Sequence, residues 1–569
     1  MRRRKVWQVY PERPELVQEV AARHGLPRLV ARLLLNRGLA EAEDILAFLA
    51  PELSRLSSPF DLPDLQKASA RLARAVKNRE PLIIYGDYDA DGLTATCLLY
   101  QFFQELGVPC TAYVPDRLTE GYGLNVAALE ALAPHGRLLV TVDCGVSDAA
   151  EVARAGDLGL EVIVTDHHEL PTELPAALAV VNPKRNLEDS PFAELAGVGV
   201  ALLLALGVRA ELREAGWFAS HPEPNLRSYL DLVALGTAAD VVPVVGENRI
   251  LVRQGLHVME ETRRPGLMAL KEVVGLENRH VSFRDLVFRL APRLNAAGRL
   301  GQARGALALL LAADMAQART QARYLHQLNR QRQGLEEDVL RQAAALISKQ
   351  GLGNRPVLVL AQEGWHPGVL GIVAARLAED YHKPVALVSL KDGQGRGSAR
   401  SIEGFHLFEG LQACKQWLLK FGGHAAAAGF SMRADNLKAL QENLEEAFYR
   451  QMGREPVRPV LKVDAAVNFP ELNDAFFKHL ERLRPFGPGN PEPVFTSKGI
   501  ACLSSRVVGD RHLKVQLVQQ DCIREAIYFN GASLHPLCGP LEAAFSTRIT
   551  YYNGRLIPEI KLLDWLPEK

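Results

Sequence analysis

A short apolar run that ends in acids occupies residues 81–92, whose sequence is PLIIYGDYDADG. The run at 82–84 is typical of a buried strand, and Asp87, Asp89 and Asp91 follow it closely. Similar apolar runs alternate with amphipathic helical stretches along the next part of the chain. This βαβ rhythm predicts an α/β fold with a parallel, doubly wound sheet.

Three further segments repeat this arrangement, and we interpret each as an apolar strand that ends in metal-type ligands. They end in Asp143, in Asp166-His167-His168 and in Asp240. In open α/β sheets, ligands bind in the crevice at the carboxyl ends of the strands, so we expect the four clusters to meet there.

Crowded carboxylates repel one another and would take up protons unless cations neutralise them. Carboxylates with one or two imidazoles suit Mg²⁺ or Mn²⁺, and two such ions can activate water and stabilise a leaving oxygen. Taken singly, an Asp after a strand more often caps a helix or forms a turn, and a His pair more often lies on the surface or in a hydrogen-bonded core than acts as a ligand. Four clusters in order favour the metal site.

The composition restricts the class of protein. The chain has 569 residues, 48% of them apolar, with 66 basic and 66 acidic side chains, which excludes general disorder and a uniformly basic surface. A local basic groove for nucleic acid stays possible. Seven scattered cysteines without a Cys-x-x-Cys pair exclude a disulfide scaffold. With neither a secretory signal nor a membrane-length apolar run, we expect a soluble, cytoplasmic protein that does not contact a membrane.

The texture of the chain predicts five regions. From about Asp314 to Lys349 the pattern is that of one long helix, and near the C-terminus alternation and an Asn553-Gly554 turn predict a small β-barrel. We place the regions at 1–75 (a helical cap), 76–310 (the first α/β domain), 311–350 (a connecting helix), 351–455 (a second, smaller α/β subdomain) and 456–569 (the barrel).

At Asp166-His167-His168 the chain resembles the DHH phosphoesterase superfamily, which takes its name from this tripeptide. Gly422-Gly423-His424 is similar to the GGH motif of the DHH-associated subdomain, and roughly residues 75–565 are most similar to the RecJ family of single-stranded-DNA-specific exonucleases. The resemblance implies a parallel-sheet DHH domain and a DHH-associated subdomain joined by a long helix, with an OB-type barrel that binds nucleic acid.

The resemblance also implies a catalytic set. Its members are Asp89, Asp91, Asp143, His167, His168 and Asp240, of which all but His168 would bind two divalent cations, preferably Mn²⁺ or else Mg²⁺. His168 would support the site and contact the scissile phosphate, and direct ligation by Asp87 is left open. We expect Asp166 to orient His167, because metal-bound imidazoles usually need such a partner.

Substrate contacts are implied at other positions. Arg117, Ser398 and Arg400 would bind the terminal 5′ phosphate, for which the planar fork of arginine is suited. The backbone of Gly422, Gly423 and His424 would approach a phosphate, unless this segment is an ordinary helix-start turn.

Further contacts are expected in two other regions. Arg293, Asn295 and Arg299 are predicted in a polar loop that lines the channel or braces the metal site. Arg506, Arg511, His512 and Lys514 of the barrel are candidate strand contacts. The aromatic residues Tyr528, Phe529, Tyr551 and Tyr552 are better interpreted as barrel core than as stacking groups.

The predicted function is 5′-to-3′ hydrolysis of single-stranded DNA by a two-metal mechanism, which releases 5′-mononucleotides in DNA repair and recombination. A DHH-type phosphodiesterase for very short oligonucleotides or cyclic dinucleotides is an alternative, although such enzymes lack the N-terminal region and the barrel. A non-catalytic DNA-binding replisome scaffold is the other, although every expected ligand is present. The expected partners are single-stranded DNA with a 5′ end, a RecQ-type helicase and a single-strand-binding protein.

Overall fold

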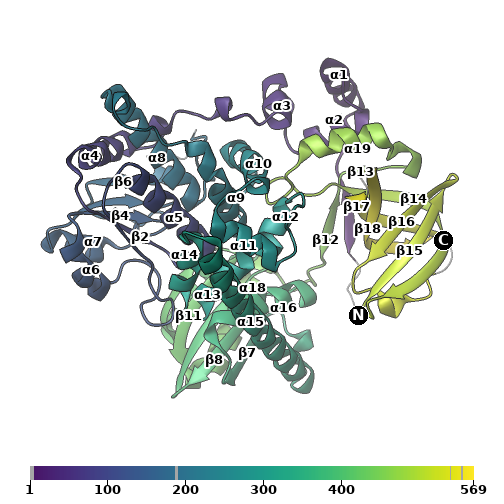
Figure 1. The fold of residues 1–569 in the computed structure, drawn as a ribbon. Helices are drawn as coiled ribbons and strands as arrows, with labels where there is room; N and C mark the ends of the chain where they lie inside the picture. The colour runs from purple at the N-terminus through teal and green to yellow at the C-terminus, as the bar shows by residue number, and fades with distance from the viewer. Residues whose placement is uncertain (1–4, 186–189, 538–539, 553–554, 569) are drawn as a thin grey trace. The chain divides into compact units, whose positions relative to one another are not determined.

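The chain divides into two units in the computed structural model (Figure 1), which describes residues 5–185, 190–537, 540–552 and 555–568, those at 548–552 and 555–557 by backbone alone. One unit contains His326–Val460 with the first six residues, and the other contains Trp7–Leu325 and Leu461–Lys569. Each unit has its own sheet and its own buried core.

A five-stranded parallel sheet forms the first half of the larger unit. The order of its strands is β3 (Cys110–Tyr113), β2 (Leu82–Gly86), β4 (Leu138–Val142), β5 (Glu161–Thr165) and β6 (Ala179–Val181). Strands β2 and β4 are buried at every residue, as expected for a sheet covered on both faces. The predicted parallel sheet is thus confirmed.

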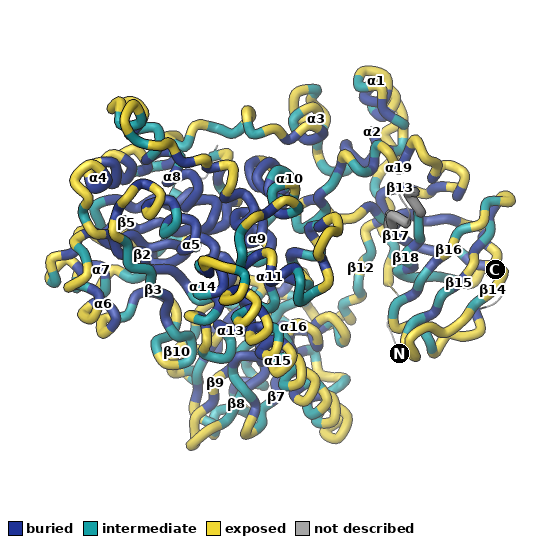
Figure 2. Tube along the Cα trace, viewed as in Figure 1, coloured by how far each residue is buried: buried dark blue, intermediate teal, exposed yellow. Residues whose placement is uncertain are grey.

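Helices cover both faces of this sheet. Helices α6 (Val126–Leu132) and α7 (Ala149–Asp157) share one core with the strands. On the other side lie α5 (Ala90–Glu105), α8 (Gly197–Glu214) and α9 (Leu230–Ala239), which pack on one another and appear largely buried in Figure 2. Helices α4 (Leu65–Asn78) and α10 (Gly246–Glu260) pack against α8 and α9.

Helix α9 corrects the prediction for the cluster at Asp240, which was interpreted as the end of a strand. The residue instead follows a helix whose first nine residues, Leu230 to Ala238, are all buried. A helix buried on every side has no polar stripe, so its apolar run cannot be told from a buried strand by periodicity.

Residues 283–299 form a continuous helical segment. It consists of α12 (Phe283–Asp285), the π-helix η7 (Leu286–Leu290) and α13 (Ala291–Arg299), preceded by α11 (Pro265–Val273) and followed by α14 (Ala303–Leu310). The loop predicted for Arg293, Asn295 and Arg299 is therefore wrong. Pro292 lies just after the π-helix, near the start of α13, and a Cβ at Gly298 would lie 2.5 Å from the Tyr88 carbonyl oxygen.

The C-terminal region is a closed β-barrel. Its strands are β14 (Val494–Val508), β15 (His512–Gln519), β16 (Cys522–Tyr528), β18 (Arg555–Pro567) and β17 (Pro540–Tyr552), and pairing of β17 with β14 closes the barrel. On β15, Leu513, Val515 and Leu517 are buried, which confirms the predicted alternation. The predicted Asn553-Gly554 turn lies outside the described residues.

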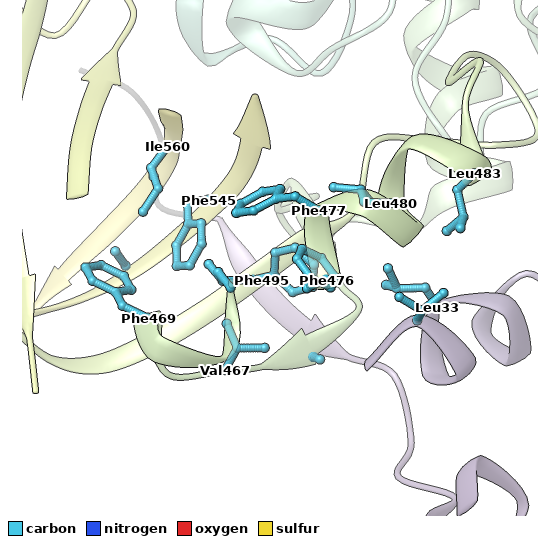
Figure 3. Close-up of a cluster of buried hydrophobic side chains, with 14 of the residues drawn as sticks. Leu33, Val467, Phe469, Phe476, Phe477, Leu480, Leu483, Phe495, Phe545 and Ile560 are labelled. Atoms are coloured by element: carbon cyan, nitrogen blue, oxygen red, sulfur yellow. The ribbon is translucent and has the colours of Figure 1, made fainter. Parts of the chain in front are cut away.

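The N-terminal helices share one apolar core with this barrel. These helices are α1 (Pro14–His24), α2 (Arg28–Asn36) and α3 (Ala42–Leu49). Figure 3 shows Phe476 and Phe477 of α19 (Asp474–Leu480) between Leu33 of α2 and the barrel residues Phe495 and Phe545. The short strands β1 (Val6–Val9), β12 (Val460–Val463) and β13 (Ala465–Ala466) complete this region, where the Tyr10 N–H donates to the Val463 carbonyl at 2.9 Å.

A buried arginine ties α10 to this region. The guanidinium of Arg249 donates hydrogen bonds to the backbone carbonyls of Phe48, Arg482, Leu483 and Arg484 at 2.9–3.0 Å, and it lies 3.8 Å from the Phe48 ring centroid. Burial, with Arg253 nearby, lowers the pKa of Arg249 to about 9. Hydrogen bonds to backbone carbonyls therefore stabilise the buried guanidinium in place of water.

The smaller unit contains the second α/β subdomain. Its sheet has the order β10 (Leu418–Gly423), β11 (Ala427–Arg433), β9 (Gln394–Arg400), β8 (Val385–Lys391) and β7 (Leu358–Glu363), of which only the β7–β8 pair is parallel. Its helices are α16 (Pro367–Tyr381), α17 (Leu407–Ala413) and α18 (Leu437–Met452). The predicted long helix is α15 (Met315–Lys349), whose 35 residues lead into this unit.

Candidate metal centre

Asp89 and Asp91 lie where β2 passes into α5. Asp89 caps the helix, because its Oδ1 accepts the N–H groups of Asp91 at 2.9 Å and Gly92 at 3.1 Å. Gly92 allows the turn to close, since a Cβ there would lie 2.7 Å from the backbone nitrogen of Asp87. The cap fixes the backbone from which Asp91 projects.

The Asp91 carboxylate meets the start of α8. It accepts the Gly197 N–H at 2.7 Å and the Val198 N–H at 2.9 Å, and the helix dipole favours negative charge at this point. Burial, with the charge of Asp89, nevertheless raises the pKa of Asp91 to about 7. A nearby cation would remove this cost.

Asp143 directly follows β4 in an unusual backbone conformation. Its φ of 62° lies in the left-handed region, which is uncommon for residues other than glycine. Its Oδ1 is buried without a hydrogen-bond partner, and burial and then the charge of Asp91 raise its pKa well above the usual range. Backbone strain together with an unpartnered buried oxygen indicates a ligand atom.

His167 lies among three carboxylates. Its Nε2 is 3.0 Å from Asp143 Oδ1, 3.7 Å from Asp240 Oδ2 and 3.8 Å from Asp91 Oδ2. Burial, followed by the charge of His168, lowers the pKa of His167 to about 3. The ring is therefore neutral at pH 7, as a metal-binding imidazole must be.

Asp166 holds His168, not His167 as expected from the sequence. Its Oδ1 lies 2.7 Å from His168 Nδ1 and also accepts the His167 backbone N–H at 2.7 Å, while Oδ2 accepts the Val146 N–H at 3.0 Å. Burial alone would lower the pKa of His168, but the hydrogen bond and charge of Asp166 outweigh it and raise that pKa to about 9. The prediction was wrong because sequence adjacency does not decide which ring turns toward the carboxylate.

The donor atoms gather into three overlapping groups, each with one atom per residue and all atoms within 4.8 Å of one another. The groups are Asp143–His167–His168, Asp91–His167–Asp240 and Asp87–Asp89–Asp143. Burial raises the pKa values of Asp87 and Asp240 well above their usual range, with further increases from Asp89 for Asp87 and from Asp91 for Asp240. Such a set of oxygen and imidazole donors fits Mg²⁺ or Mn²⁺, and without a cation the carboxylates repel one another.

Tyr122, which no sequence pattern predicted to be functional, also belongs to this site. Its Oη donates to the Asp143 carbonyl at 3.3 Å and lies 3.0 Å from His168 Nδ1. Gly121 and Gly123 flank it with φ of 89° and 87°, and Asp148 anchors the loop by accepting the Leu124 N–H at 2.8 Å. The Gly-Tyr-Gly pattern next to Arg117 was the available signal.

Three other predicted residues belong to the larger unit. Asn295 accepts the Ala90 N–H at 2.8 Å and so braces the start of α5, which agrees with one of its two expected roles. Arg293 donates to the Arg289 carbonyl one turn earlier. The Arg117 guanidinium lies 5.1 Å from the centroid of the ring of Tyr88, a residue of the loop between β2 and α5.

The predicted substrate residues of the smaller unit come together on one sheet. Ser398 and Gly422 lie on either side of Gly429, in one row across β9, β11 and β10. Arg400 Nη1 lies 3.3 Å from Ser398 Oγ, and a Cβ at Gly371 would come within 2.8 Å of Arg400 Nη2.

Gly423 and His424 lie at the hairpin between β10 and β11, where the His424 N–H donates to the Ala427 carbonyl at 2.8 Å. The alternative of a helix-start turn is therefore wrong.

The barrel candidates differ in their surroundings. Arg506 and Lys514 are partners in register on β14 and β15, and Lys514 Nζ lies 2.5 Å from Glu525 Oε2. Arg511 is exposed between these strands, whereas Tyr528 is buried, which confirms the core interpretation for that residue. Phe529 contacts His512 edge to face, with 5.1 Å between the ring centroids. The side chains of Tyr551 and Tyr552 lie outside those described.

A parallel sheet that carries this cluster of carboxylate and imidazole donors is what the resemblance to the DHH phosphoesterases predicted, and family models match the chain accordingly. The DHH family N-terminal domain matches residues 81–237, the DHHA1 domain matches 354–450 and the RecJ OB domain matches 463–564. The single-stranded-DNA-specific exonuclease RecJ of Dickeya dadantii is 40% identical over 508 residues, which cover 86% of this chain and 87% of that protein. The chain belongs to the RecJ family.

Solved structures support the same placement. The crystal structure of RecJ in complex with Mn²⁺ from Thermus thermophilus is similar, with a TM-score of 0.84 and 33% identity, and the match covers all of this chain and 80% of that one. The Mg²⁺ complex from the same organism has a TM-score of 0.77 and 32% identity, covering 100% of this chain and 79% of that one. Within the described residues, no helix combines the length and hydropathy needed to cross a membrane.

Proposed function

We propose that this protein is a single-stranded-DNA-specific exonuclease that hydrolyses phosphodiesters from the 5′ end and releases 5′-mononucleotides. The observation that carries the proposal is the convergence of Asp91, Asp143, His167 and Asp240 on shared positions in a RecJ-family chain. Such a cluster of donors serves phosphoester hydrolysis through bound divalent cations.

Asp89, Asp91, Asp143, His167 and Asp240 would hold two divalent cations, Mn²⁺ preferably or Mg²⁺. When bound, these ions supply a hydroxide at neutral pH and stabilise charge on the phosphate and the leaving oxygen. Asp143 and His167 each belong to two of the three donor groups, so they are the natural shared ligands. Asp87 supplies a further oxygen beside Asp89 and Asp143.

His168 would contact the scissile phosphate. Because Asp166 holds its Nδ1 at 2.7 Å, the Nε2 edge is the one that can meet a phosphate oxygen. The Tyr122 hydroxyl lies 3.0 Å from the same nitrogen and further restrains the ring. This arrangement fixes the imidazole before the substrate arrives, which is how a preorganised site lowers a barrier.

The terminal 5′ phosphate would be bound by Ser398 and Arg400 of β9, with the backbone of Gly422 and Gly423 in β10 of the same sheet, and by Arg117. The row formed by Ser398, Gly429 and Gly422 supports this assignment, since two of its three residues lack side chains that would keep a phosphate away. Arg293 and the barrel residues Arg506, Arg511 and Lys514 would attract the remaining strand.

The partners that suit this activity are a RecQ-type helicase, which would supply the single strand, and a single-strand-binding protein that would keep it open. These strands arise during repair and recombination, and we place the activity in the cytoplasm.

A labelled single strand with a 5′ phosphate tests the proposal. Wild-type protein with Mn²⁺ should release mononucleotides from the 5′ end and leave a blunt duplex intact, whereas Asp143→Asn should lose the activity. Asp157→Asn, at the far end of α7, is a matched control that should retain it. Cleavage confined to di- and trinucleotides or cyclic dinucleotides, or Mn²⁺ binding without cleavage, would reject this substrate class.

A further inference from the structure

A cavity of about 510 Å³ lies in the larger unit, away from the donor cluster. Its lining comes from α10, from the start of α12, from the segment around η12 (Glu481–Leu483) that follows α19, and from the barrel. Residues far apart in sequence therefore form one concave surface beside the barrel.

The lining carries an excess of positive charge. Four basic side chains and two acidic ones line it, namely Arg253, Arg284, Arg484 and Lys561 against Glu481 and Glu492. Arg484 Nε is paired with Glu481 at 2.8 Å, and Arg253 donates to the Arg484 carbonyl at 3.2 Å. Among the described residues, Arg284 forms no ion pair with a carboxylate. The cavity is suited to an anionic ligand.

Aromatic rings line the same cavity. Phe486 lies 5.5 Å below the guanidinium of Arg484, and Phe529 meets His512 edge to face. Aromatic faces stack on bases, while arginines pair with phosphates, and single-strand binding sites combine the two. A nucleotide can use both the arginines and the aromatic rings of this lining, whereas an inorganic anion can use only the arginines.

The cavity and the donor cluster are joined by the helical segment 283–299. Arg284 lines the cavity, and Asn295, eleven residues later, holds the Ala90 N–H beside Asp89. Eleven helical residues span about 16 Å, which is a distance of a few nucleotides along an extended strand. Phe288 lies between them with 67% of its surface exposed, and the Arg284 guanidinium lies 5.5 Å from its ring.

We propose that this cavity binds one nucleotide of the single-stranded substrate a few residues 3′ of the scissile bond, with Arg284 on a phosphate and Phe529 on the base. The inference rests on the proposed function for the identity of the strand. It assigns a second anchoring point, which would hold the substrate in register after each terminal nucleotide leaves.

Binding measured without hydrolysis tests this assignment. Fluorescence anisotropy in EDTA would compare full-length protein on 5′-phosphorylated oligothymidylates of about 15 and about three nucleotides, over a series of salt concentrations. The variants are Arg284→Gln, which removes the proposed phosphate contact, and Phe529→Leu, which keeps an apolar side chain but removes the ring. Arg279→Gln is the matched control, because Arg279 is exposed, lies five residues before Arg284 and does not line the cavity.

Arg284→Gln should weaken binding of the long strand roughly five- to tenfold and lower the salt slope by about 0.7 relative to Arg279→Gln. Phe529→Leu should weaken binding by roughly the same factor with an unchanged slope. Both losses should be confined to the long strand, with melting temperatures equal to that of the wild type.

Equal effects of Arg284→Gln and Arg279→Gln, or unchanged binding by Phe529→Leu, would overturn the assignment, as would an equal loss on both strands. If the wild type binds with this length dependence but does not cut the strand, the proposed function fails and the cavity assignment stands.

Discussion

Replacing Gly197 with alanine tests whether the metal centre depends on the close approach of α8 to Asp143. A Cβ at this position would lie 2.7 Å from Asp143 Oδ1 and 2.8 Å from its Cβ, whereas ordinary contacts begin at 3.4 Å. The Gly197 N–H also donates to Asp91 at 2.7 Å. The methyl group must therefore displace Asp143 or pull α8 away from Asp91, by roughly 0.7 Å in either case.

The expected cost follows from this displacement. Misplacement of a catalytic group by about 1 Å can reduce a rate about 100-fold, so we expect a ten- to hundredfold loss of kcat, or about 1.4–2.7 kcal/mol. Overpacking should also destabilise the fold by about 1–3 kcal/mol, partly offset by about 1 kcal/mol from the better helix propensity of alanine. The loss of activity should thus exceed what unfolding explains.

The assay is the initial rate of release of 5′-labelled nucleotide at saturating Mn²⁺, together with a titration of Mn²⁺. Gly199→Ala is the matched control on α8, because its Cβ would meet only the movable Leu195 side chain, at 3.0 Å. Equal rates and equal Mn²⁺ affinities in the two variants would show that the close approach of α8 does not set the donor geometry.

Three other perturbations have defined outcomes. Without metal, burial raises the pKa of Asp91 from 3.8 to about 7, so the folded chain binds more protons than the unfolded chain between these pH values. The melting temperature in EDTA should therefore fall as the pH rises from about 4 to about 7, and excess Mn²⁺ should reverse the trend. A melting temperature that does not change with pH would contradict the crowding of carboxylates around Asp91. Tyr122→Phe removes the hydroxyl beside His168 and should lower kcat roughly fivefold, the effect of about 1 kcal/mol, with little change in Mn²⁺ affinity by calorimetry; an unchanged kcat would show that the hydroxyl does not position the ring. Arg249→Leu removes the side-chain donor from the carbonyls of Phe48 and Arg482 and should destabilise the larger unit by about 2–5 kcal/mol in urea unfolding. Arg227→Leu on the surface should cost about 0.5 kcal/mol or less, and equal midpoints would refute the role given to Arg249.

The chemistry of the metal centre could be predicted from the sequence because each ligand lies near a recognisable boundary. Asp89 and Asp143 follow buried strands, and His167 follows β5, so the carboxyl edge of a parallel sheet brings them together whatever the details of packing. The barrel was predictable for a related reason, since alternation along β15 records which side of a strand is buried.

Other features were decided by contacts between distant parts of the chain. Asp240 ends a helix because α9 is enclosed by its neighbours, and such burial removes the periodicity that would have shown it. Asp166 turns to His168, and Tyr122 joins the same ring, through rotamers that no local pattern encodes. The sharing of one core by the N-terminal helices and the barrel likewise depends on the apolar surfaces available in the folded chain.

The amino-acid sequence by itself therefore determined the donor types, their order along a parallel sheet and the β-barrel, because strand periodicity and side-chain chemistry are local properties. The tertiary structure alone decided which donor atoms face one another, how α13 braces α5 and where a basic, aromatic cavity forms. Those outcomes depend on the packing of segments separated by up to hundreds of residues, where a shift below 1 Å changes the contact.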